Sequence, residues 1–398
     1  MVKLKLDQDI TLATQPGSQR IRAFDIIRGY FLVVILIDHI ELYPSGWDLF
    51  TGRGRLLVSA AEGFFFMSGL LVGLVYRRRI AQGMKFIFAK MWRRAVELYI
   101  ASVFFTLLYT VTAVFLNHPS VKDGLYTIIN WPHIIKETLL MRYGYGWADF
   151  LDRFAILMFM APFGFYLLFK RKWWLLAAAS LIAWAFRGDS FTLSWQIIFT
   201  LGMVVGYHWH ELTARWRSVK AQTRSRLKRL TVWAAAITFA LSYASVYILS
   251  VLNERWAHLP AWGQSFTGHW NSVNTWVWLY SQKWTMGPVR IVLFMLWFGA
   301  LFMIVRRYEA RIFRYSHGFL ELLGRNSLFV YIAHSMIVFI FKLLLPTSTN
   351  IGENFLITGA ALACLIAVTV IYKRLQPSIH FRAKRPQSLR TLPGSVKS

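Results

Sequence analysis

The sequence predicts an all-α protein, a polytopic bundle of about ten transmembrane helices with both termini in the cytoplasm. Hydrophobic residues make up 56% of its 398 residues, more than a soluble domain of this size needs. Long apolar runs such as 231–252 and 355–372 carry no charge and approach or reach the roughly 20 residues that cross a bilayer as a helix. Lys and Arg residues gather in short clusters between such runs, and clusters of this kind set the membrane orientation.

The apolar runs give the expected positions of the helices. The fifth range is short and is followed by Arg187 and Asp189, so we expect this helix to tilt or the bilayer to thin around it. In chain order the ranges are 24–43, 56–76, 95–117, 150–169, 173–186, 193–210, 230–252, 289–305, 326–345 and 355–372.

Positive charge alternates along this series, which supports both the number and the direction of the helices. A basic cluster follows every second helix, whereas the intervening loops hold few Lys or Arg residues. Because basic loops stay on the cytoplasmic side, the first helix is expected to run outward and the second inward, and each later pair repeats this pattern. The clusters are Arg77–Arg79 with Lys85, Lys90, Arg93 and Arg94; 170–172; 215–229; 306–314; and the tail from Lys373.

One domain is expected to hold all the helices. We expect a cytoplasmic segment over 1–20, a single transmembrane domain over 21–375, and a basic, disordered tail over 376–398. Residues 1–19 lack an apolar signal core, so the first helix is expected to be retained. The net charge of +27 lies in loop clusters, which favours the anionic headgroups of a lipid bilayer over nucleic acid as partner. The lone Cys364 excludes a disulfide within the chain.

Two predicted outer segments, 117–149 and 253–288, are long and rich in Trp, Tyr, Gly and His. Long loops of this kind favour a cover over a site that opens to the outer face. Alternatively, their aromatic side chains form an interfacial belt, and for most of the individual Trp and Tyr residues this is the preferred interpretation.

Ionisable side chains inside apolar helices are the best candidates for function, because an unpaired charge is unfavourable in a bilayer. In the first helix these include Asp25, Arg28, Asp38 and His39. Arg28 and His39 are eleven positions apart, so they lie on one helical face, about 16 Å apart along the axis. In the simpler alternative, Asp25 is only a helix N-terminal charge and Arg28 only reaches the headgroups.

The second helix brings another carboxylate to the same depth. Counted from the outer helix ends, Glu62 and His39 are level, so we expect Glu62 to contact the imidazole and hold its tautomer. Asp38 points roughly 100° away from His39 and is badly placed to do so. Gly69 and Gly73 form a small-xxx-small step that predicts close packing against another helix.

Three further polar residues are expected to line the same cavity: Asp152 and Arg153 at the start of the fourth helix and His334 in the ninth. Adjacent residues are badly placed to pair with each other, so we expect Asp152 and Arg153 each to pair across helices. The sequence contains no Gly-rich phosphate loop, no His-Glu-x-x-His helix and no nucleophile elbow. No motif in the sequence predicts a metal site.

Several motifs resemble one known family. Residues 22–29 followed by 37–40 are similar to the opening of the OpgC family, membrane proteins that succinylate osmoregulated periplasmic glucans. The spacing of Arg28 and His39 also looks like the Arg-x10-His signature of the wider transmembrane acyltransferase superfamily. Further matches occur in the family's order over most of the chain: 61–69, Trp195–Gln196 before Leu201–Gly202, 287–290, and 323–328 leading to His334.

This resemblance implies O-acyl transfer, of a succinyl or acetyl group, from cytoplasmic acyl-CoA to a hydroxyl of an extracytoplasmic glycan at the bacterial cytoplasmic membrane. His39 would act as the base near neutral pH, and no metal or redox cofactor is needed. Gly63 and the long basic loop after the sixth helix depart from the family and leave the substrate open. The implied catalytic residues are His39, Asp38 and Glu62. The residues expected to bind the acyl donor are Arg28, Arg22 and Asp25. The residues expected to line the substrate cavity are Asp152, Arg153, Gln196, Arg290 and His334.

The main alternative is a secondary transporter or exporter of a glycan or glycolipid, because intramembrane Asp, His and Glu residues also form proton relays. Transporters commonly contain internal repeats with interrupted helices at corresponding positions. The Arg28 to His39 pattern has no repeat in the second half of the chain, which favours the acyltransferase. The sequence leaves open the acyl group, an acyl-enzyme intermediate and the oligomeric state.

Overall fold

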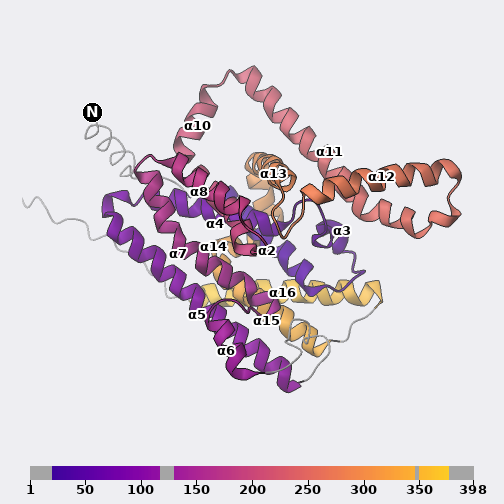
Figure 1. Ribbon diagram of the computed structural model, residues 1–398, viewed down its shortest axis with the longest axis horizontal. Coiled ribbons are helices and arrows are strands. Elements are labelled where there is room, and N and C mark those ends of the chain that lie inside the picture. The colour runs from indigo at the N-terminus through magenta and orange to yellow at the C-terminus, as the bar shows by residue number, and fades with distance from the viewer. Residues whose placement is uncertain (1–19, 117–129, 346–348, 376–398) are drawn as a thin grey trace, which may run out of the picture.

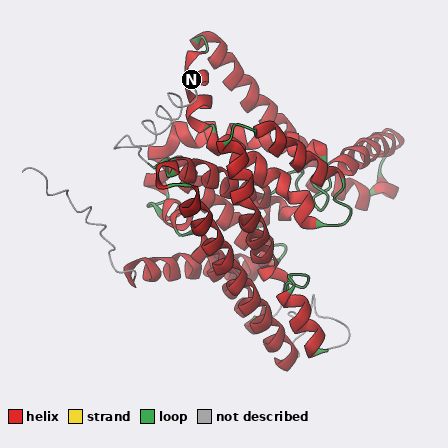
Figure 2. Cartoon of the chain, turned by 60° about the vertical axis from the view of Figure 1, so that its left-hand side comes forward, coloured by secondary structure: helices red, strands yellow, loops and turns green. Residues whose placement is uncertain are grey.

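The computed structural model describes residues 20–116, 130–345 and 349–375 (Figure 1). Over this part of the chain the secondary structure is helical, without strands (Figure 2). The expected tail and all but the last residue of the expected N-terminal segment lie outside the described residues. Each of the ten predicted ranges holds a helix: α2 (Arg22–Ile40), α4 (Ala60–Arg77), α5 (Met84–Leu116), α7 (Asp149–Phe169), α8 (Trp173–Ala185), α9 (Phe191–Tyr207), α11 (Ala221–Glu254), α13 (Pro288–Tyr315), α15 (Ser327–Leu344) and α16 (Ile351–Leu375).

In the described residues, five further α-helices lie between these ten: α3 (Asp48–Thr51), α6 (Trp131–Leu139), α10 (Trp209–Ser218), α12 (Ala261–Tyr280) and α14 (Phe319–Arg325). Helix α12 corrects one expectation. Most of the outer segment 253–288 forms this helix, which pairs with the end of α11 in a hairpin that projects from the bundle (Figure 1). Asn253 and Asn271 exchange two side-chain hydrogen bonds across the hairpin. Residues 261–280 are therefore an arm rather than a cover, whereas the loop 281–287 stays at the end of the bundle.

Seven of the described helices are long and apolar enough to cross a membrane: α4, α5, α7 with its preceding turn, α11, α13, α15 and α16. Helices α8 and α9 are apolar but shorter. Helix α2 carries Arg22, Asp25, Arg28 and Asp38 within its nineteen residues. The chain is therefore a multi-pass membrane protein, while a total of ten crossings stays a prediction.

Helices α4 and α9 approach each other closely through glycine. A Cβ added at Gly69 would lie 1.9 Å from the carbonyl oxygen of Phe199, and one at Gly206 would lie 1.9 Å from that of Leu70. Gly73 and Gly202 are equally tight, with carbonyl oxygens at 2.2 and 2.1 Å. The predicted close packing at Gly69 and Gly73 is confirmed, and the partner is a second small-xxx-small step in α9.

Helix α2 lies inside the bundle, in contact with α4, α13, α14, α15 and α16. Its crossing with α14 is also close, because a Cβ at Gly29 would lie 1.9 Å from the carbonyl oxygen of Leu320. The helix ends at Ile40, where Glu41 adopts a left-handed backbone with φ of 55°. Asp25, Arg28, Asp38 and His39 therefore face protein rather than lipid, as functional charges in a membrane protein do, whereas Arg22 at the start of the helix is exposed.

The helix ends define two ends of the bundle. The basic end holds the clusters at Arg77–Arg79, 215–229 and 306–314, and the far end holds the loops 41–59 and 281–287. At the basic end Arg77 pairs with Glu211. At the far end the indole nitrogen of Trp195 donates to the carbonyl oxygen of Lys283.

Candidate active site

His39 and His334 face each other between α2 and α15. Nδ1 of His39 lies 3.0 Å from Nε2 of His334, and the two ring centroids are 5.2 Å apart. His334 is fully buried, whereas His39 is half-buried. The second nitrogen of His334, Nδ1, contacts the carbonyl oxygen of Tyr331 one turn earlier in α15. The pair of imidazoles is therefore anchored on the backbone through the buried His334.

These contacts determine the tautomer of each neutral ring. A carbonyl oxygen only accepts, so Nδ1 of His334 must carry the proton that it donates to Tyr331. Nε2 of His334 is then an acceptor, and Nδ1 of His39 must donate to it. The remaining nitrogen of His39, Nε2, keeps a free lone pair and has no hydrogen-bond partner within the part of the chain that the structure describes. His39 is thus oriented as a base.

Glu62 does not hold the imidazole of His39, which corrects the predicted contact. One carboxylate oxygen of Glu62 accepts from Nε of Arg290. The other accepts from the backbone N–H of Ser59 at 2.9 Å and from its hydroxyl at 2.5 Å, which forms a capping box at the start of α4. Glu62 is 0% exposed and the Arg290 side chain 4% exposed, so each charge needs the other.

Asp38 lies on the other side of His39. Its Oδ1 is buried without a hydrogen-bond partner among the described residues, and its Oδ2 lies against Gly54, where an added Cβ would be 3.4 Å away. The backbone carbonyl of Asp38 accepts from the hydroxyl of Tyr43. One carboxylate oxygen of Asp38 is therefore buried near the far-end loop without a hydrogen-bond partner among the described residues.

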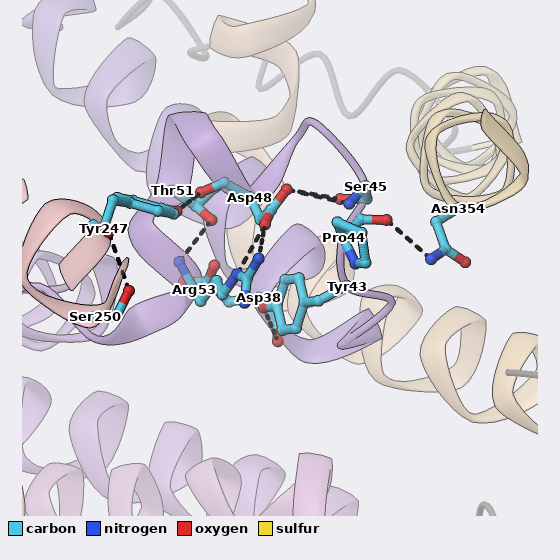
Figure 3. A network of polar contacts seen from close by, with 10 residues as sticks. All are labelled: Asp38, Tyr43, Pro44, Ser45, Asp48, Thr51, Arg53, Tyr247, Ser250 and Asn354. Carbon is cyan, nitrogen blue, oxygen red and sulfur yellow. Dashed lines mark hydrogen bonds and ion pairs between the residues drawn. The ribbon is translucent and has the colours of Figure 1, made fainter. Parts of the chain in front are cut away.

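The loop 41–59 closes the far end over α2 (Figure 3). Asp48 organises it by accepting from Nε of Arg53 at 2.8 Å and from the N–H of Ser45 at 3.2 Å. The hydroxyl of Tyr247 in α11 donates to the Asp48 carbonyl, and the amide of Asn354 in α16 donates to another carbonyl of the loop. Because two distant helices hold this loop, it forms a fixed cover beside Asp38 at the end of α2.

Lys283 is a candidate that sequence reasoning missed. It lies in the loop 281–287, within electrostatic range of the Asp38 and Glu62 carboxylates and of the His39 imidazole. Gly54 also shows where the Lys283 side chain lies, since a Cβ added at Gly54 would be 4.0 Å from Nζ of Lys283. The available signal was a basic residue in a predicted outer segment that is poor in Lys and Arg.

A cavity of about 590 Å³ opens at the basic end between α2, α4, α5, α7 and α15. Its wall includes Arg28, Lys90, Arg93 and Arg94, and its inner part is aromatic and aliphatic. Arg28 donates to the hydroxyl of Ser327, while its Nε is buried without a hydrogen-bond partner among the described residues. The cavity reaches Tyr331, whose ring packs edge-on against His334 at a centroid distance of 4.6 Å.

Three other predicted site residues do not line this cavity. Asp25 forms an ion pair with Arg20, and Arg22 forms one with Glu321. Gln196 bonds to both the hydroxyl and the carbonyl oxygen of Ser180, which ties α9 to α8. Their polar groups are engaged in these contacts, and the predicted roles of Arg22 and Asp25 in donor binding and of Gln196 in the substrate cavity stay predictions.

A second, polar cavity of about 400 Å³ lies at the far end. It is lined by Asp149, Asp152 and Arg153 of α7 together with Tyr143 and Asp189 of nearby loops. Arg153 pairs with Asp149 one turn earlier and lies over the ring of Phe191, so the expected pairing of its charge across helices is wrong. Oδ1 of Asp152 is buried and has no hydrogen-bond partner among the described residues.

Lys283 relates this cavity to the histidine pair, because its charge also interacts with Asp149. Among the described residues no group of three or more His, Cys, Asp and Glu side chains is placed to hold a metal ion. The arrangement therefore combines an oriented imidazole, a nearby cation and two cavities at opposite ends.

Comparison with known proteins gives one match. A family model described as OpgC protein matches residues 20–377, which is most of the chain. No curated protein and no solved structure matches.

Proposed function

The chain belongs to the OpgC family, and from that premise we propose that it is an integral membrane O-acyltransferase. It moves a succinyl or acetyl group from cytoplasmic acyl-CoA to a hydroxyl of an extracytoplasmic glycan. Family membership and the apolar helices favour a membrane acyltransferase. The observation that carries the residue-level proposal is the free Nε2 of His39, oriented through His334, whose neighbour Tyr331 lines the basic cavity.

The basic end would face the cytoplasm, together with both chain termini, in a bacterial cytoplasmic membrane. Its cavity offers cations to the phosphates of acyl-CoA, and Arg28 suits this role because its Nε lacks a partner among the described residues. Arg93 and Arg94 already share Glu97, so their charges are partly compensated. The apolar inner part of the cavity suits the pantetheine arm, with the thioester near Tyr331.

The far-end cavity would bind the acceptor. Sugar hydroxyls both donate and accept hydrogen bonds, and Asp149, Asp152, Arg153 and Tyr143 offer complementary groups. The unpartnered Oδ1 of Asp152 is free to accept from a hydroxyl. This assignment places the acceptor on the extracytoplasmic side, opposite the donor.

The chemical step then uses His39 as the base. Nε2 of His39 takes the proton of the acceptor hydroxyl while the hydroxyl oxygen forms a bond to the thioester carbonyl carbon. The carbon–sulfur bond breaks, CoA leaves as a thiolate, and the proton passes from His39 to that sulfur. Lys283 would stabilise the negative charge that develops on the carbonyl oxygen.

The transporter alternative needs a path along which protons travel. The histidine pair ends at the backbone carbonyl of Tyr331, which does not titrate and so does not extend a relay. This contact favours a fixed tautomer over proton conduction. Proton-coupled uptake of a solute into liposomes, without any thioester turnover, would support the transporter instead.

The test compares His39→Ala with His269→Ala, which changes an exposed histidine of α12. Both variants are expected to insert into the membrane and to elute from a size-exclusion column at the same volume as the wild type. We expect mass spectrometry of envelope glycans to show no acyl mass with His39→Ala and the full acyl mass with His269→Ala. Acylation at the wild-type level with His39→Ala would remove His39 from the mechanism. The added mass also identifies the acyl group.

A further inference from the structure

A large basic pocket lies outside the proposed reaction site. It has a volume of about 1030 Å³ and is formed by α10, α11 and α13 at the basic end, where α10 and α11 meet in an arch (Figure 1). No Asp or Glu residue is among those that line it. The basic residues around it are Arg78, Arg217, Lys228, Arg229, Arg306 and Arg307.

Most of this charge has no internal partner. Arg306 pairs with Glu309, but the other five cations form no ion pair with a described carboxylate. Arg78 contrasts with its neighbour Arg77: Arg77 pairs with Glu211, whereas Nε of Arg78 is buried without a hydrogen-bond partner among the described residues. Cations gathered without acidic partners favour an anionic ligand, and phosphate is the anion that arginine binds best.

An apolar groove continues from this pocket into the membrane-spanning part of the bundle. The groove has a volume of about 280 Å³ and shares Val232 and Ile304 with the basic pocket. It extends between α11 and α13 on one side and α2 on the other as far as Ser59 at the start of α4. Aliphatic and aromatic side chains make up nearly all of its wall, so it suits a hydrocarbon chain.

We propose that the pocket and groove together bind one anionic phospholipid, with its phosphate among the cations and one acyl chain along the groove. The continuity of a basic and an apolar space is the reason, since a soluble phosphate fills only the first and a neutral lipid leaves the cations unpaired. Trp209, Trp216 and Trp233 line the basic pocket, and Trp is the residue typical of the headgroup level. The lipid would fill the space under the α10–α11 arch.

This site is independent of the proposed acyl transfer. The donor cavity lies between α2, α4, α5, α7 and α15. It shares no lining residue with the basic pocket or the groove, although α2 and α4 contribute other residues to the groove. Loss of the lipid therefore leaves the histidine pair in place, and lipid binding can be measured without acyl-CoA.

The first experiment tests the charges. Purified protein is titrated with phosphatidylglycerol and, separately, with phosphatidylethanolamine, and bound lipid is counted by native mass spectrometry. We expect the wild type to bind the anionic lipid more tightly. The triple variant Lys228→Gln, Arg229→Gln, Arg307→Gln should weaken that binding at least about tenfold, because each cation near an anionic headgroup contributes on the order of 1 kcal/mol.

The matched control removes the same charge from α10 and α11 outside the pocket, as Arg215→Gln, Arg224→Gln, Arg226→Gln. These three cations do not line the pocket, so we expect this variant to bind phosphatidylglycerol within about twofold of wild type. The loss of about tenfold is expected only when pocket cations are removed. An equal loss in both triple variants would mean that net charge alone attracts lipid, and the site would be rejected. Five of the six substitutions change exposed side chains and Arg224 is half-buried at the surface of α11, so both proteins are expected to fold.

The second experiment separates a lipid from a soluble phosphate. Ala235 lines the groove and Ala234 next to it is exposed, so Ala235→Phe should block the acyl chain while Ala234→Phe should not. We expect Ala235→Phe, but not Ala234→Phe, to weaken phosphatidylglycerol binding about tenfold. We also expect glycerol phosphate to compete poorly with the lipid for the wild-type protein. Wild-type lipid binding by Ala235→Phe, or equal competition by glycerol phosphate, would overturn the lipid assignment.

Discussion

The imidazoles of His39 and His334 are in direct contact, with Nδ1 to Nε2 at 3.0 Å, although 295 positions separate them in the chain. The carbonyl oxygen of Tyr331 fixes the far nitrogen of the pair. His334 therefore positions His39 in the way that a carboxylate positions the base in many hydrolases, but without a charge.

Replacing His334 should impair the chemical step more than donor binding. In His334→Phe the acceptor for Nδ1 of His39 is lost, so the ring also populates the tautomer whose Nε2 carries a proton. We expect kcat for acyl transfer to fall about 10² to 10⁴-fold with little change in KM for acyl-CoA. His334→Gln keeps an acceptor oxygen and should retain more activity. Equal kcat values for His334→Phe and wild type would separate His334 from catalysis.

Lys283 is expected to assist the reaction through its charge. Lys283→Met removes a cation that interacts with His39 and Asp38, and we expect kcat to fall on the order of a hundredfold. Lys283→Arg should recover part of this loss because it restores the charge. Lys136→Met, in α6, is the control and should leave kcat unchanged. Activity that Lys283→Met and Lys283→Arg lower equally would show that shape, not charge, matters at this position.

The ten helical ranges and the glycine step were predictable because both are local properties of the chain. The length of an apolar run and the charges that flank it indicate where a transmembrane helix lies. Two glycines four positions apart indicate the helix face against which another helix packs closely. The arm formed by α12 was not predictable in this way, since its Trp, His and Asn residues also suit an irregular interfacial loop.

The contacts of the site were only partly predictable. The depth of Glu62 follows from counting residues, but the direction of its side chain depends on Arg290, which lies 228 positions away. The shared depth left both His39 and Arg290 possible as partners of Glu62. Glu62 pairs with the Arg290 guanidinium because a buried charge without a partner is more unfavourable than a neutral imidazole without one. The motif containing His334 indicated a cavity residue without indicating that it binds His39.

The buried pair of Glu62 and Arg290 should matter for stability. Arg290→Met leaves the Glu62 carboxylate buried without its cation, and we expect a loss of about 3 to 5 kcal/mol in unfolding free energy. Adding Glu62→Gln removes the uncompensated charge and keeps an acceptor for Ser59, so the double variant should be more stable than Arg290→Met. Thermal unfolding in detergent measures both. A double variant less stable than Arg290→Met would argue against the pair as the cause.

The glycine contact between α4 and α9 should tolerate no side chain. In Gly206→Ala the new methyl group would lie 1.9 Å from the carbonyl oxygen of Leu70, so the helices must move apart. We expect a marked fall in the yield of monodisperse protein and a loss of about 2 kcal/mol or more. Gly299→Ala is the matched control, because an added Cβ there meets no atom within 4 Å. Equal yields of the two variants would refute the close packing.

The far-end cover should weaken in acid because of Asp48. Burial raises the pKa of the Asp48 carboxyl, but the hydrogen bonds from Arg53 and from the Ser45 amide outweigh burial, so the pKa lies below its usual value. A carboxylate with a lowered pKa stabilises the fold above the unfolded-state value of about 3.9, and this contribution disappears as the pH falls through the folded-state pKa.

Asp48→Asn should therefore be less stable than wild type at pH 7, by about 1.5 kcal/mol. The difference should shrink as the pH falls below about 4 and on through the lower folded-state pKa of Asp48, because the wild-type carboxyl loses its charge over that range. Unfolding midpoints of both proteins between neutral pH and pH 3 measure this, with Asp189→Asn on another far-end loop as the control for losing an exposed carboxylate. A gap between Asp48→Asn and wild type that stays constant down to the lowest pH would assign the effect to shape rather than to the charge on Asp48.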